Sequence, residues 1–528
     1  MASLNVAIVG AGLSGLATLK QCLEEGIRAT VFEARSSIGG HWGDDSDPPA
    51  GLTSSYGKQH AFTTSIYEGV VLKSCRDTTA FSDFPIDPAR YPDYLGRRMF
   101  KQYLDEYADH FALKEHIRLD TMVLGCKILH NGKWLVTHRK EGEDLVEELY
   151  DAVFACSGHL SEPLIPDIEG KDLFKGEIVH SKEYRRPSRF EGKRVAIIGF
   201  GSSAADIACE LAGQAKELHL ITRRGGWVLP RYIQGKPIET LNSRIVETVL
   251  PKTLTKWAQE RLCKAVTGTL PKEIQPKHGL KEANITIRSD LLENIKLKRI
   301  TVRRAEEAVK IQEDGLTLAG GMTLEVDTII FCTGYRVDYP YLPAEAYRSQ
   351  EHGILEPEPT NSVDLYKLIV SPRFPKLYFI GLAEVLGPLP PVAEVQARWA
   401  TAILTNRVRL PSIEAMYIYI RRYQSHLRRN MVNSERHAIS IRYLPYCDDL
   451  LSDLGAAPKF TLLFKKVLTS SPIVGLRAMK AVYLGISSPA QYRLFGYGAK
   501  RDLATETLLR LSKKEQRLSD EERRLLGL

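Results

Sequence analysis

The sequence predicts an α/β fold with two successive units in which parallel strands alternate with helices. The first observation is a buried strand, a G-x-G-x-x-G turn and a helix within residues 6–25. The second is a repeat of this pattern, as G-x-G-x-x-A, at residues 194–206. In each unit a later apolar strand ends in a small-residue turn, at residues 151–158 and 327–335. We therefore expect two Rossmann-like dinucleotide-binding domains, with a helical insertion in the second and a helical C-terminal region.

Length and composition bound the kind of protein. At 528 residues, with 44% hydrophobic residues, the chain can bury two or three domain cores. The net charge of +8 is mild, and no basic patch with interleaved aromatic residues indicates nucleic-acid binding. The 8 cysteines are scattered without a C-x-x-C pair, which argues against zinc sites, disulfide scaffolds and dithiol chemistry.

The first glycine turn is predicted to hold a dinucleotide. Gly10 makes the tight turn, Gly12 lets the backbone approach a pyrophosphate, and Gly15 allows close packing of helix on strand. The helix N-terminus then offers free N–H groups to the phosphates. Glu33 closes the second strand, where an acidic residue binds ribose hydroxyls. The expected ligand has a free ribose 2′-hydroxyl and is FAD or NAD.

The second unit differs from the first at the position of the acidic residue. Gly199 and Gly201 repeat the turn, but Arg223 and Arg224 stand where the first unit has Glu33. Arginine pairs with a 2′-phosphate through a planar fork, so the site is interpreted as binding NADP(H). The alternative is a second NAD-like site with solvent-facing arginines.

The positions of these two units predict how the whole chain is divided into domains. We expect the first domain at residues 1–165 and 335–445, the second at 170–330, and a helical C-terminal region at 446–528. Residues 235–283 predict amphipathic helices inserted in the second domain, which either lie on a membrane surface or pack on their own domain. A surface loop is expected at 43–60, and a capping box at Ser519 starts a last helix.

Four further segments resemble one enzyme family. Residues 174–184 match F-x-G-x-x-x-H-x-x-x-[YF], and residues 331–335, 395–400 and 488–494 are also similar. Together these segments resemble the flavin-containing monooxygenases, in the style of the animal members. The related Baeyer–Villiger enzymes usually end the first motif in tryptophan, whereas this chain has Tyr184. The resemblance implies FAD in the first domain and NADPH in the second.

The resemblance also implies roles for individual residues. His180 is expected in the inter-domain linker, where the family uses it to hold the geometry between the cofactor domains. Lys73 replaces a family asparagine that contacts both the flavin and the nicotinamide, and its ammonium could attract a flavin-bound peroxide anion. The predicted FAD-binding residues are Gly10, Ala11, Gly12, Leu13, Ser14, Gly15, Glu33, His41, Trp42, Lys73 and Ser74. The predicted NADPH-binding residues are Gly199, Gly201, Ser203, Ala204, Ala205, Asp206, Arg223 and Arg224.

The implied activity is an NADPH-dependent monooxygenase that uses O2 and oxygenates small soft nucleophiles, such as amines and sulfides, through a flavin hydroperoxide. Baeyer–Villiger oxygenation of ketones, which Lys73 favours, is one alternative. An NADPH oxidase that releases hydrogen peroxide is another, and a non-catalytic flavoprotein is a third, which the two intact glycine motifs disfavour.

The expected location is cytoplasmic. The chain enters its first strand almost at once, so no signal peptide is expected. No stretch reaches the ~18 apolar residues of a membrane span. Peripheral contact with the cytoplasmic face of an internal membrane and a homodimer both stay open.

Overall fold

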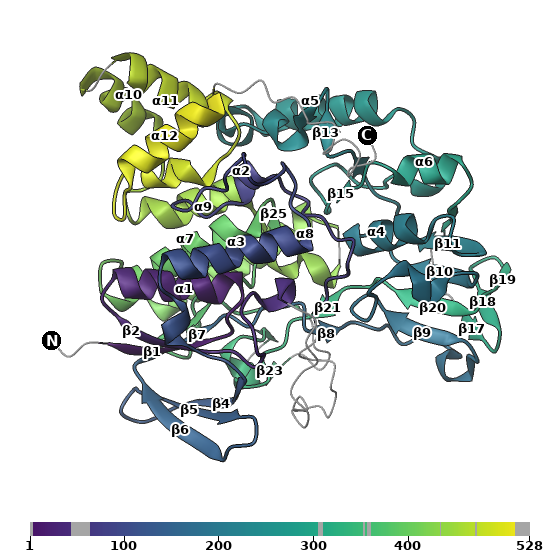
Figure 1. The fold of residues 1–528 in the computed structure, drawn as a ribbon, viewed down its shortest axis with the longest axis horizontal. Helices are drawn as coiled ribbons and strands as arrows, with labels where there is room; N and C mark the ends of the chain where they lie inside the picture. Colours follow the sequence, from purple (N-terminus) through teal and green to yellow (C-terminus); the bar gives the residue numbers. More distant parts are fainter. Residues whose placement is uncertain are drawn as a thin grey trace.

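Two parallel sheets form the core of the protein. The computed structural model describes residues 4–43, 64–304, 310–351, 354–355, 361–432, 434–469 and 472–512. The loop expected at 43–60 falls largely outside these ranges, as does the capping box at Ser519. The two five-stranded sheets lie side by side, each with helices packed on it (Figure 1). The predicted α/β class with two dinucleotide-binding units is confirmed.

The first sheet gathers strands from distant parts of the chain. Its order is β24-β7-β1-β2-β3, with every pairing parallel. These strands are β24 (Leu377–Phe379), β7 (Ala152–Ala155), β1 (Asn5–Val9), β2 (Arg28–Phe32) and β3 (Ile117–Arg118). β1 is central, so its apolar side chains are almost fully buried. Helix α1 (Leu13–Glu24) follows directly and packs against α7 (Leu389–Leu404).

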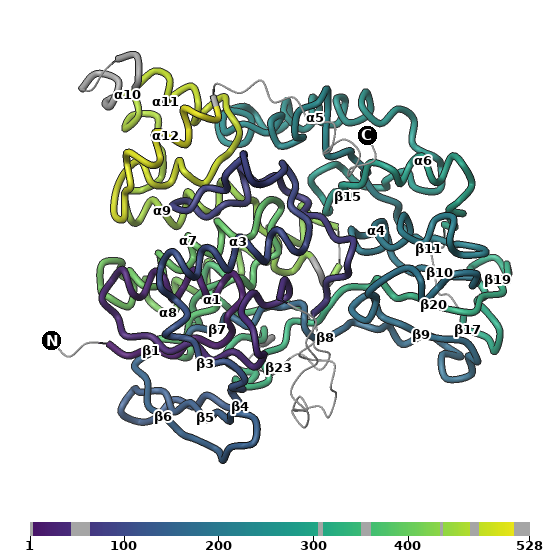
Figure 2. The backbone as a smooth tube through the Cα atoms, in the orientation of Figure 1, coloured from purple at the N-terminus to yellow at the C-terminus, as the bar shows by residue number. Residues whose placement is uncertain are grey.

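The second sheet repeats this arrangement. Its order is β16-β11-β10-β20-β9, again all parallel. The strands are β16 (Thr301–Arg304), β11 (Glu217–Thr222), β10 (Arg194–Ile198), β20 (Thr328–Phe331) and β9 (Glu177–His180), with α4 (Ser202–Leu211) after β10. The traced chain leaves the first sheet, builds the second and then returns, as the colours of Figure 2 show. β24 is the strand added on that return.

Other elements surround the first sheet. A three-stranded antiparallel sheet is formed by β4 (Thr121–Ile128), β5 (Trp134–Lys140) and β6 (Leu145–Tyr150), and Gly132 has a positive φ in the turn between β4 and β5. Two further helices, α3 (Arg97–His110) and α8 (Ile413–Asn430), also surround the first sheet. The C-terminal part is helical as expected, with α9 (Tyr443–Ser452), α10 (Phe460–Thr469), α11 (Pro472–Leu484) and α12 (Arg501–Ser512).

The insertion at 235–283 is less helical than its amphipathic pattern predicts. It contains one long α-helix, α5 (Lys252–Thr267), preceded by a single π-helical turn at Ile245–Val249. Much of the rest of the insertion consists of short strands, 3-10 turns and loops. Prolines stand at both ends of α5, and they favour these structures because proline cannot continue a helix. Downstream, α6 (Leu291–Lys296) leads back to the second sheet.

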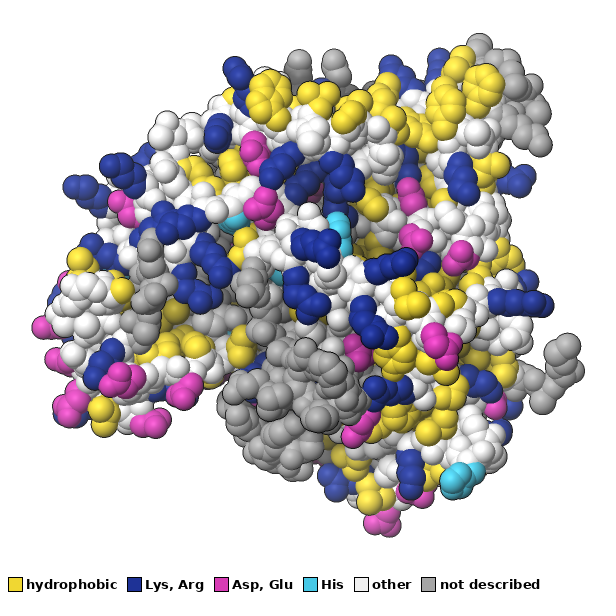
Figure 3. All heavy atoms as spheres, turned by 180° about the vertical axis from the view of Figure 1, so that it is seen from behind, with side chains coloured by type: hydrophobic (Ala, Val, Ile, Leu, Met, Phe, Trp, Pro, Cys, Tyr) yellow, Lys and Arg dark blue, Asp and Glu magenta, His cyan; other side chains and the backbone are white. Residues whose placement is uncertain are grey.

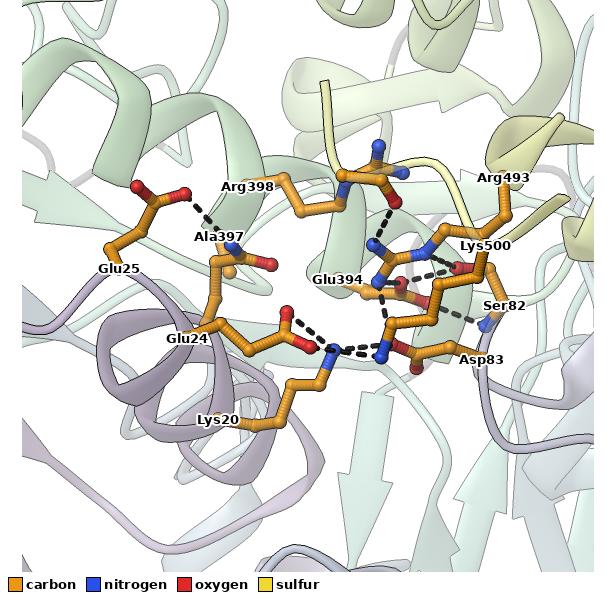
Figure 4. A network of polar contacts seen from close by, with 12 residues as sticks. Lys20, Glu24, Glu25, Ser82, Asp83, Glu394, Ala397, Arg398, Arg493 and Lys500 are labelled. Carbon is orange, nitrogen blue, oxygen red and sulfur yellow. Dashed lines mark hydrogen bonds and ion pairs between the residues drawn. The ribbon is translucent and has the colours of Figure 1, made fainter. Parts of the chain in front are cut away.

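A buried ionic network joins the C-terminal region to the first sheet's helices (Figure 4). The Arg493 guanidinium donates to Ser82 Oγ at 2.6 Å, to Asp83 Oδ2 at 2.8 Å and to Glu394. Lys20 of α1 also pairs with Asp83. Both basic groups are almost fully buried, so their charges need these partners to compensate for lost hydration. The network therefore fixes the position of the C-terminal helices on the first unit.

Candidate cofactor and active site

The first glycine turn is built as the sequence predicts. Gly10 follows β1 with φ of +101°, and a Cβ added there would lie 2.9 Å from Cys156 O. A Cβ on Gly15 would lie 1.8 Å from Gly10 O, so α1 packs directly against the turn. Gly12 is the N-cap of α1, and no side chain caps that end. The first-turn N–H groups are therefore available to a phosphate.

Glu33 closes the turn from the neighbouring strand. Its Oε2 accepts a hydrogen bond from Ala11 N at 2.7 Å, and its Oε1 accepts one from Arg35 N at 3.0 Å. Burial raises the pKa of Glu33, while these backbone N–H groups favour the ionised form. A carboxylate has about four acceptor positions. The N–H groups of Ala11, Ala34 and Arg35 use three of them, so about one position remains for a ribose hydroxyl.

The segment after β2 returns to the glycine turn. A Cβ on Gly40 would lie 2.9 Å from Gly12 Cα, so two glycines face one another here. Burial lowers the pKa of His41 to about 3, and its Nδ1 lies 3.1 Å from Ser65 Oγ. Trp42 packs edge-on against Phe100, with ring centroids 4.7 Å apart. Trp42 thus makes a core contact from this loop.

The remaining predicted residues of the first site divide into two groups. Ala11 and Ser14 are buried in the turn and the first turn of α1, and Leu13 is half-buried beside them. Ser14 O accepts a hydrogen bond from Thr18 Oγ1 at 2.8 Å. Ser74 lies in a separate segment, with its Oγ 2.7 Å from Thr79 Oγ1.

The second glycine turn is a structural copy of the first. Gly199 has φ of +131°, and a Cβ added there would lie 2.4 Å from Cys332 O. Cys332 follows β20 as Cys156 follows β7, so both turns meet the same kind of neighbouring strand. Gly201 is the N-cap of α4, again without a side-chain cap. Two equivalent uncapped helix N-termini therefore lie at the carboxyl edges of the two sheets, and each could hold a phosphate.

The first turns of α4 and the end of β11 carry the other predicted NADPH residues. Ala204 and Ala205 are buried against the second core, and Ser203 is half-buried. Arg223 is exposed and makes no hydrogen bond or ion pair with the part of the chain that the structure describes. Arg224 is half-buried beside it. An exposed guanidinium at the edge of the sheet suits a 2′-phosphate.

Lys73 crosses from the first unit to the second. Its Nζ lies 2.6 Å from Asp206 Oδ1, and Ile287 O accepts a longer hydrogen bond at 3.4 Å. Asp206 is only 2% exposed and also accepts a hydrogen bond from Tyr67. Arg288 Nη1 lies 3.4 Å from the same carboxylate. The ammonium is therefore paired with a protein carboxylate, which weakens the expectation that it acts as a lone cation beside the flavin.

Burial and neighbouring charges have opposing effects on the pKa of Lys73. Burial lowers its pKa, while the Asp206 carboxylate raises it, and the charge on Arg231 lowers it further. The side chain is nevertheless 27% exposed, so it reaches solvent at this junction. Its carboxylate partner favours the protonated form.

His180 does not lie in a linker. It is the last residue of β9, an edge strand of the second sheet, paired with Phe331 of β20. The two apolar residues before it, Ile178 and Val179, let β9 pair with β20 at the edge of the sheet. Such a short run does not distinguish a strand from a loop in the sequence, which explains the expectation of a linker. The imidazole is fully buried, its Nδ1 accepts a hydrogen bond from Lys182 N at 3.1 Å, and burial lowers its pKa to about 4. His180 is therefore neutral at pH 7.

Sequence reasoning missed three residues of the junction. Tyr67, Arg231 and Arg288 surround the Lys73–Asp206 pair, but no motif marks any of them. Their partners lie far away in the sequence, and only the fold brings them together. Tyr67 carries no local signal, and the only signal of Arg231 and Arg288 is a basic side chain in a largely apolar segment.

The chain is similar to known proteins over nearly its whole length. The model of the flavin-binding monooxygenase-like family matches residues 3–519. Flavin-containing monooxygenase 5 of Rattus norvegicus is 32% identical over 97% of this chain and 93% of its own length. Dimethylaniline monooxygenase [N-oxide-forming] 2 of the same species is 33% identical over 94% of this chain and 89% of its own length.

Solved structures share the fold. S-allyl-L-cysteine S-oxygenase from Allium sativum aligns over 97% of this chain and 99% of its own, with a TM-score of 0.63 and 23% identity. A closed cyclohexanone monooxygenase aligns over 85% of this chain and 97% of its own, with a TM-score of 0.61 and 16% identity. Because both identities are below 25%, these matches show a shared fold, including the arrangement of the two sheets.

Proposed function

The chain belongs to the flavin-binding monooxygenase-like family and is an FAD- and NADPH-dependent monooxygenase, and we propose that it oxygenates nitrogen or sulfur in small soft nucleophiles. The observation that carries the proposed substrate class is the match to N-oxide-forming dimethylaniline monooxygenase. The pair of equivalent glycine turns, each followed by a helix without a side-chain cap, supports the use of two nucleotide cofactors. The balanced reaction consumes the substrate, O2, NADPH and a proton, and yields the oxygenated product, NADP+ and water.

We assign the two cofactors to the two units. Residues 1–165 and 335–445 form the proposed FAD-binding domain, and residues 170–330 the proposed NADPH-binding domain. β24, which joins the first sheet after the chain has built the second, supports this division. The N-termini of α1 and α4 bind the phosphates, Glu33 accepts a hydrogen bond from a ribose hydroxyl, and Arg223 and Arg224 receive the 2′-phosphate.

The chain's own residues orient and shield the reaction. When bound, FAD and NADPH supply the oxidation–reduction chemistry that activates O2. The Lys73–Asp206 ion pair sets the spacing between the two units, because its partners come from different units. Burial of Tyr67 and Asp206 beside it reduces the access of water. Because Lys73 is already paired with a carboxylate, it gives no separate support to ketone oxygenation.

The cofactor assignment predicts a preference for NADPH over NADH. Loss of a charge-assisted pair costs on the order of 1.5–3 kcal/mol, or roughly tenfold to a hundredfold in binding. The double variant Arg223→Ala/Arg224→Ala should therefore lose this preference in methyl phenyl sulfide oxygenation. The measurement is kcat/KM for each cofactor, with Arg189→Ala, an exposed arginine paired with Glu177, as the matched control. Equal use of both cofactors by the wild type would refute the assignment.

We also propose peripheral contact with an anionic membrane surface. No helix among the described residues is both long and apolar enough to cross a bilayer. α5 nevertheless exposes Leu254 at 53% and Trp257 at 58%, and α10 exposes Phe460 at 55%. Figure 1 draws α5 and α10 along one edge, and Figure 3 has hydrophobic side chains together with basic ones along that edge. This combination suits the interface of an anionic bilayer.

A further inference from the structure

Three cations meet where the two units join, and they outnumber the ionised carboxylates they contact. Lys73 comes from the first unit, and Arg231 and Arg288 come from the second. Lys73 pairs with Asp206, and Arg288 pairs with Asp290 at 2.6 Å while also approaching Asp206. Arg231 makes no ion pair with any residue that the structure describes. The cluster therefore carries an excess positive charge.

Arg231 is the residue that most needs a further partner. It is only 6% exposed, its Nε has no hydrogen-bond acceptor within the described ranges, and its Nη2 donates only one long bond, 3.4 Å, to Val71 O. Its guanidinium lies 5.9 Å from the Tyr94 ring centroid, a modest cation–π contact. The Asp206 and Asp290 carboxylates favour the charged form of Arg231 from a distance, but no carboxylate among the described residues contacts its guanidinium. Because a buried charge without a close counter-charge is costly, a negatively charged ligand would stabilise this arrangement.

The nearby acidic groups do not supply that counter-charge. Asp93 pairs with Arg76 at 2.9 Å and accepts a bond from Tyr232. Glu239 accepts hydrogen bonds from Cys75 N at 2.9 Å and from Tyr94 OH at 2.7 Å. Burial raises the pKa of Glu239 to about 7, so it is only partly ionised at neutral pH.

The cluster also lies between the two glycine turns. Residues 64–75 connect them, because Ser65 Oγ lies 3.1 Å from His41 Nδ1 beside the first turn and Lys73 reaches Asp206 in α4 beside the second. Nucleotides bound at the two turns would lie at the carboxyl edges of both sheets, on either side of this junction. A ligand held by the cluster would therefore lie between the two cofactors.

We propose that Arg231 and Lys73 bind the carboxylate of a substrate that also carries the soft nitrogen or sulfur atom. The proposal rests on the proposed function, which supplies the oxygenation itself. The phosphates of the cofactors have their own partners at the N-termini of α1 and α4 and at Arg223, so they do not need this cluster. Lys73 keeps Asp206 as a partner and uses its solvent-reaching face for the ligand.

The test compares two sulfides that differ by one carboxylate, 4-(methylthio)benzoate and methyl phenyl sulfide. Their equilibrium binding to the FAD-loaded protein with NADP+ is measured by titration calorimetry at pH 7.5. The wild type is expected to bind the carboxylate at least tenfold more tightly. Arg231→Gln and, separately, Lys73→Gln should each remove most of this preference, and the FAD content of each variant is measured by its absorbance. Lys175→Gln, which alters an exposed lysine paired with Glu313, is the control and should retain the preference.

Each outcome decides the proposal. Equal affinity of the wild type for both sulfides would overturn it. Weaker NADP+ binding in Arg231→Gln, with an unchanged sulfide preference, would assign the cluster to a cofactor phosphate and also overturn it. If Arg231→Gln loses FAD, two other variants decide the proposal. Lys73→Gln should lose the preference, and the charge-conserving Arg231→Lys should keep it. Selective carboxylate binding without any sulfoxide formation would support the proposal and contradict the proposed function.

Discussion

At the scale of single residues, glycines without room for a side chain shape both turns. Gly10 and Gly199 combine positive φ with a neighbouring carbonyl within 3 Å of an added Cβ. This requirement is local, so the sequence motif predicts it well. The role of Lys73 is different, because its partner Asp206 is 133 residues away. The position of Lys73 could be predicted by resemblance, whereas its ion pair depends on how the two units pack.

His180 predicts a pH-dependent stability. Its folded pKa of about 4 lies below the ordinary 6.5, so the unfolded chain binds more protons between these values. Its contribution to stability is therefore complete above pH 6.5 and is lost as pH falls toward 4, by about 3 kcal/mol in total. His180→Gln should unfold more easily at pH 7 but show a shallower pH dependence. Urea unfolding from pH 7.5 to 4.5 measures this.

The control for this prediction is His130→Gln, at an exposed histidine. It should keep the wild-type pH dependence. An unchanged slope in His180→Gln would mean that another group, such as the buried His41, causes the acid sensitivity.

At the scale of elements, local patterns predicted the two strand–turn–helix units, but not the insertion. β1 and β10, with the glycine turn and helix after each, match their predicted positions, because the apolar strands and the glycine spacing are strong signals. The insertion kept only α5 as a long α-helix, since prolines and glycines divide its amphipathic pattern. A short edge strand such as β9 gives too weak a pattern to separate it from a loop, so the sequence alone does not assign His180 to a strand.

The C-terminal helices should depend on Arg493. Arg493→Met removes the shared partner of Asp83 and Glu394 and leaves buried carboxylates with fewer donors. Breaking a buried ionic network in this way costs about 3–5 kcal/mol. Urea unfolding should show that loss, together with faster proteolysis of the C-terminal region. Arg189→Met, at an exposed ion pair, should change stability by less than about 1 kcal/mol. Equal effects of both variants would contradict the structural role of the network.

At the scale of the whole molecule, the two-unit architecture could be predicted because each unit repeats the same short motif. The sequence also predicted that the chain returns to the first domain at residues 335–445, and the structure has β24 (Leu377–Phe379) in the first sheet. What could not be predicted is the junction, where Tyr67, Arg231 and Arg288 contribute from separate segments. Such contacts depend on the relative orientation of the units, which no local pattern encodes.

Membrane contact should be peripheral and sensitive to salt. The double variant Leu254→Gln/Trp257→Gln removes exposed apolar surface from α5 and should reduce co-flotation with liposomes containing phosphatidylserine. Leu145→Gln, at a residue of β6 that is 60% exposed, is the control and should bind as the wild type does. Raising the salt concentration should weaken wild-type binding, because it screens the attraction of basic residues to anionic lipid. Binding that resists both salt and carbonate would contradict a peripheral contact.

The central claim, that this chain is a monooxygenase, is tested most directly with isotopic oxygen. The FAD-loaded protein is given NADPH, methyl phenyl sulfide and 18O2, and the product is analysed by mass spectrometry alongside NADPH consumption. The account predicts a sulfoxide that carries one 18O atom, formed in proportion to the NADPH consumed. Consumption of NADPH that yields only hydrogen peroxide, or a sulfoxide without the label, would contradict it.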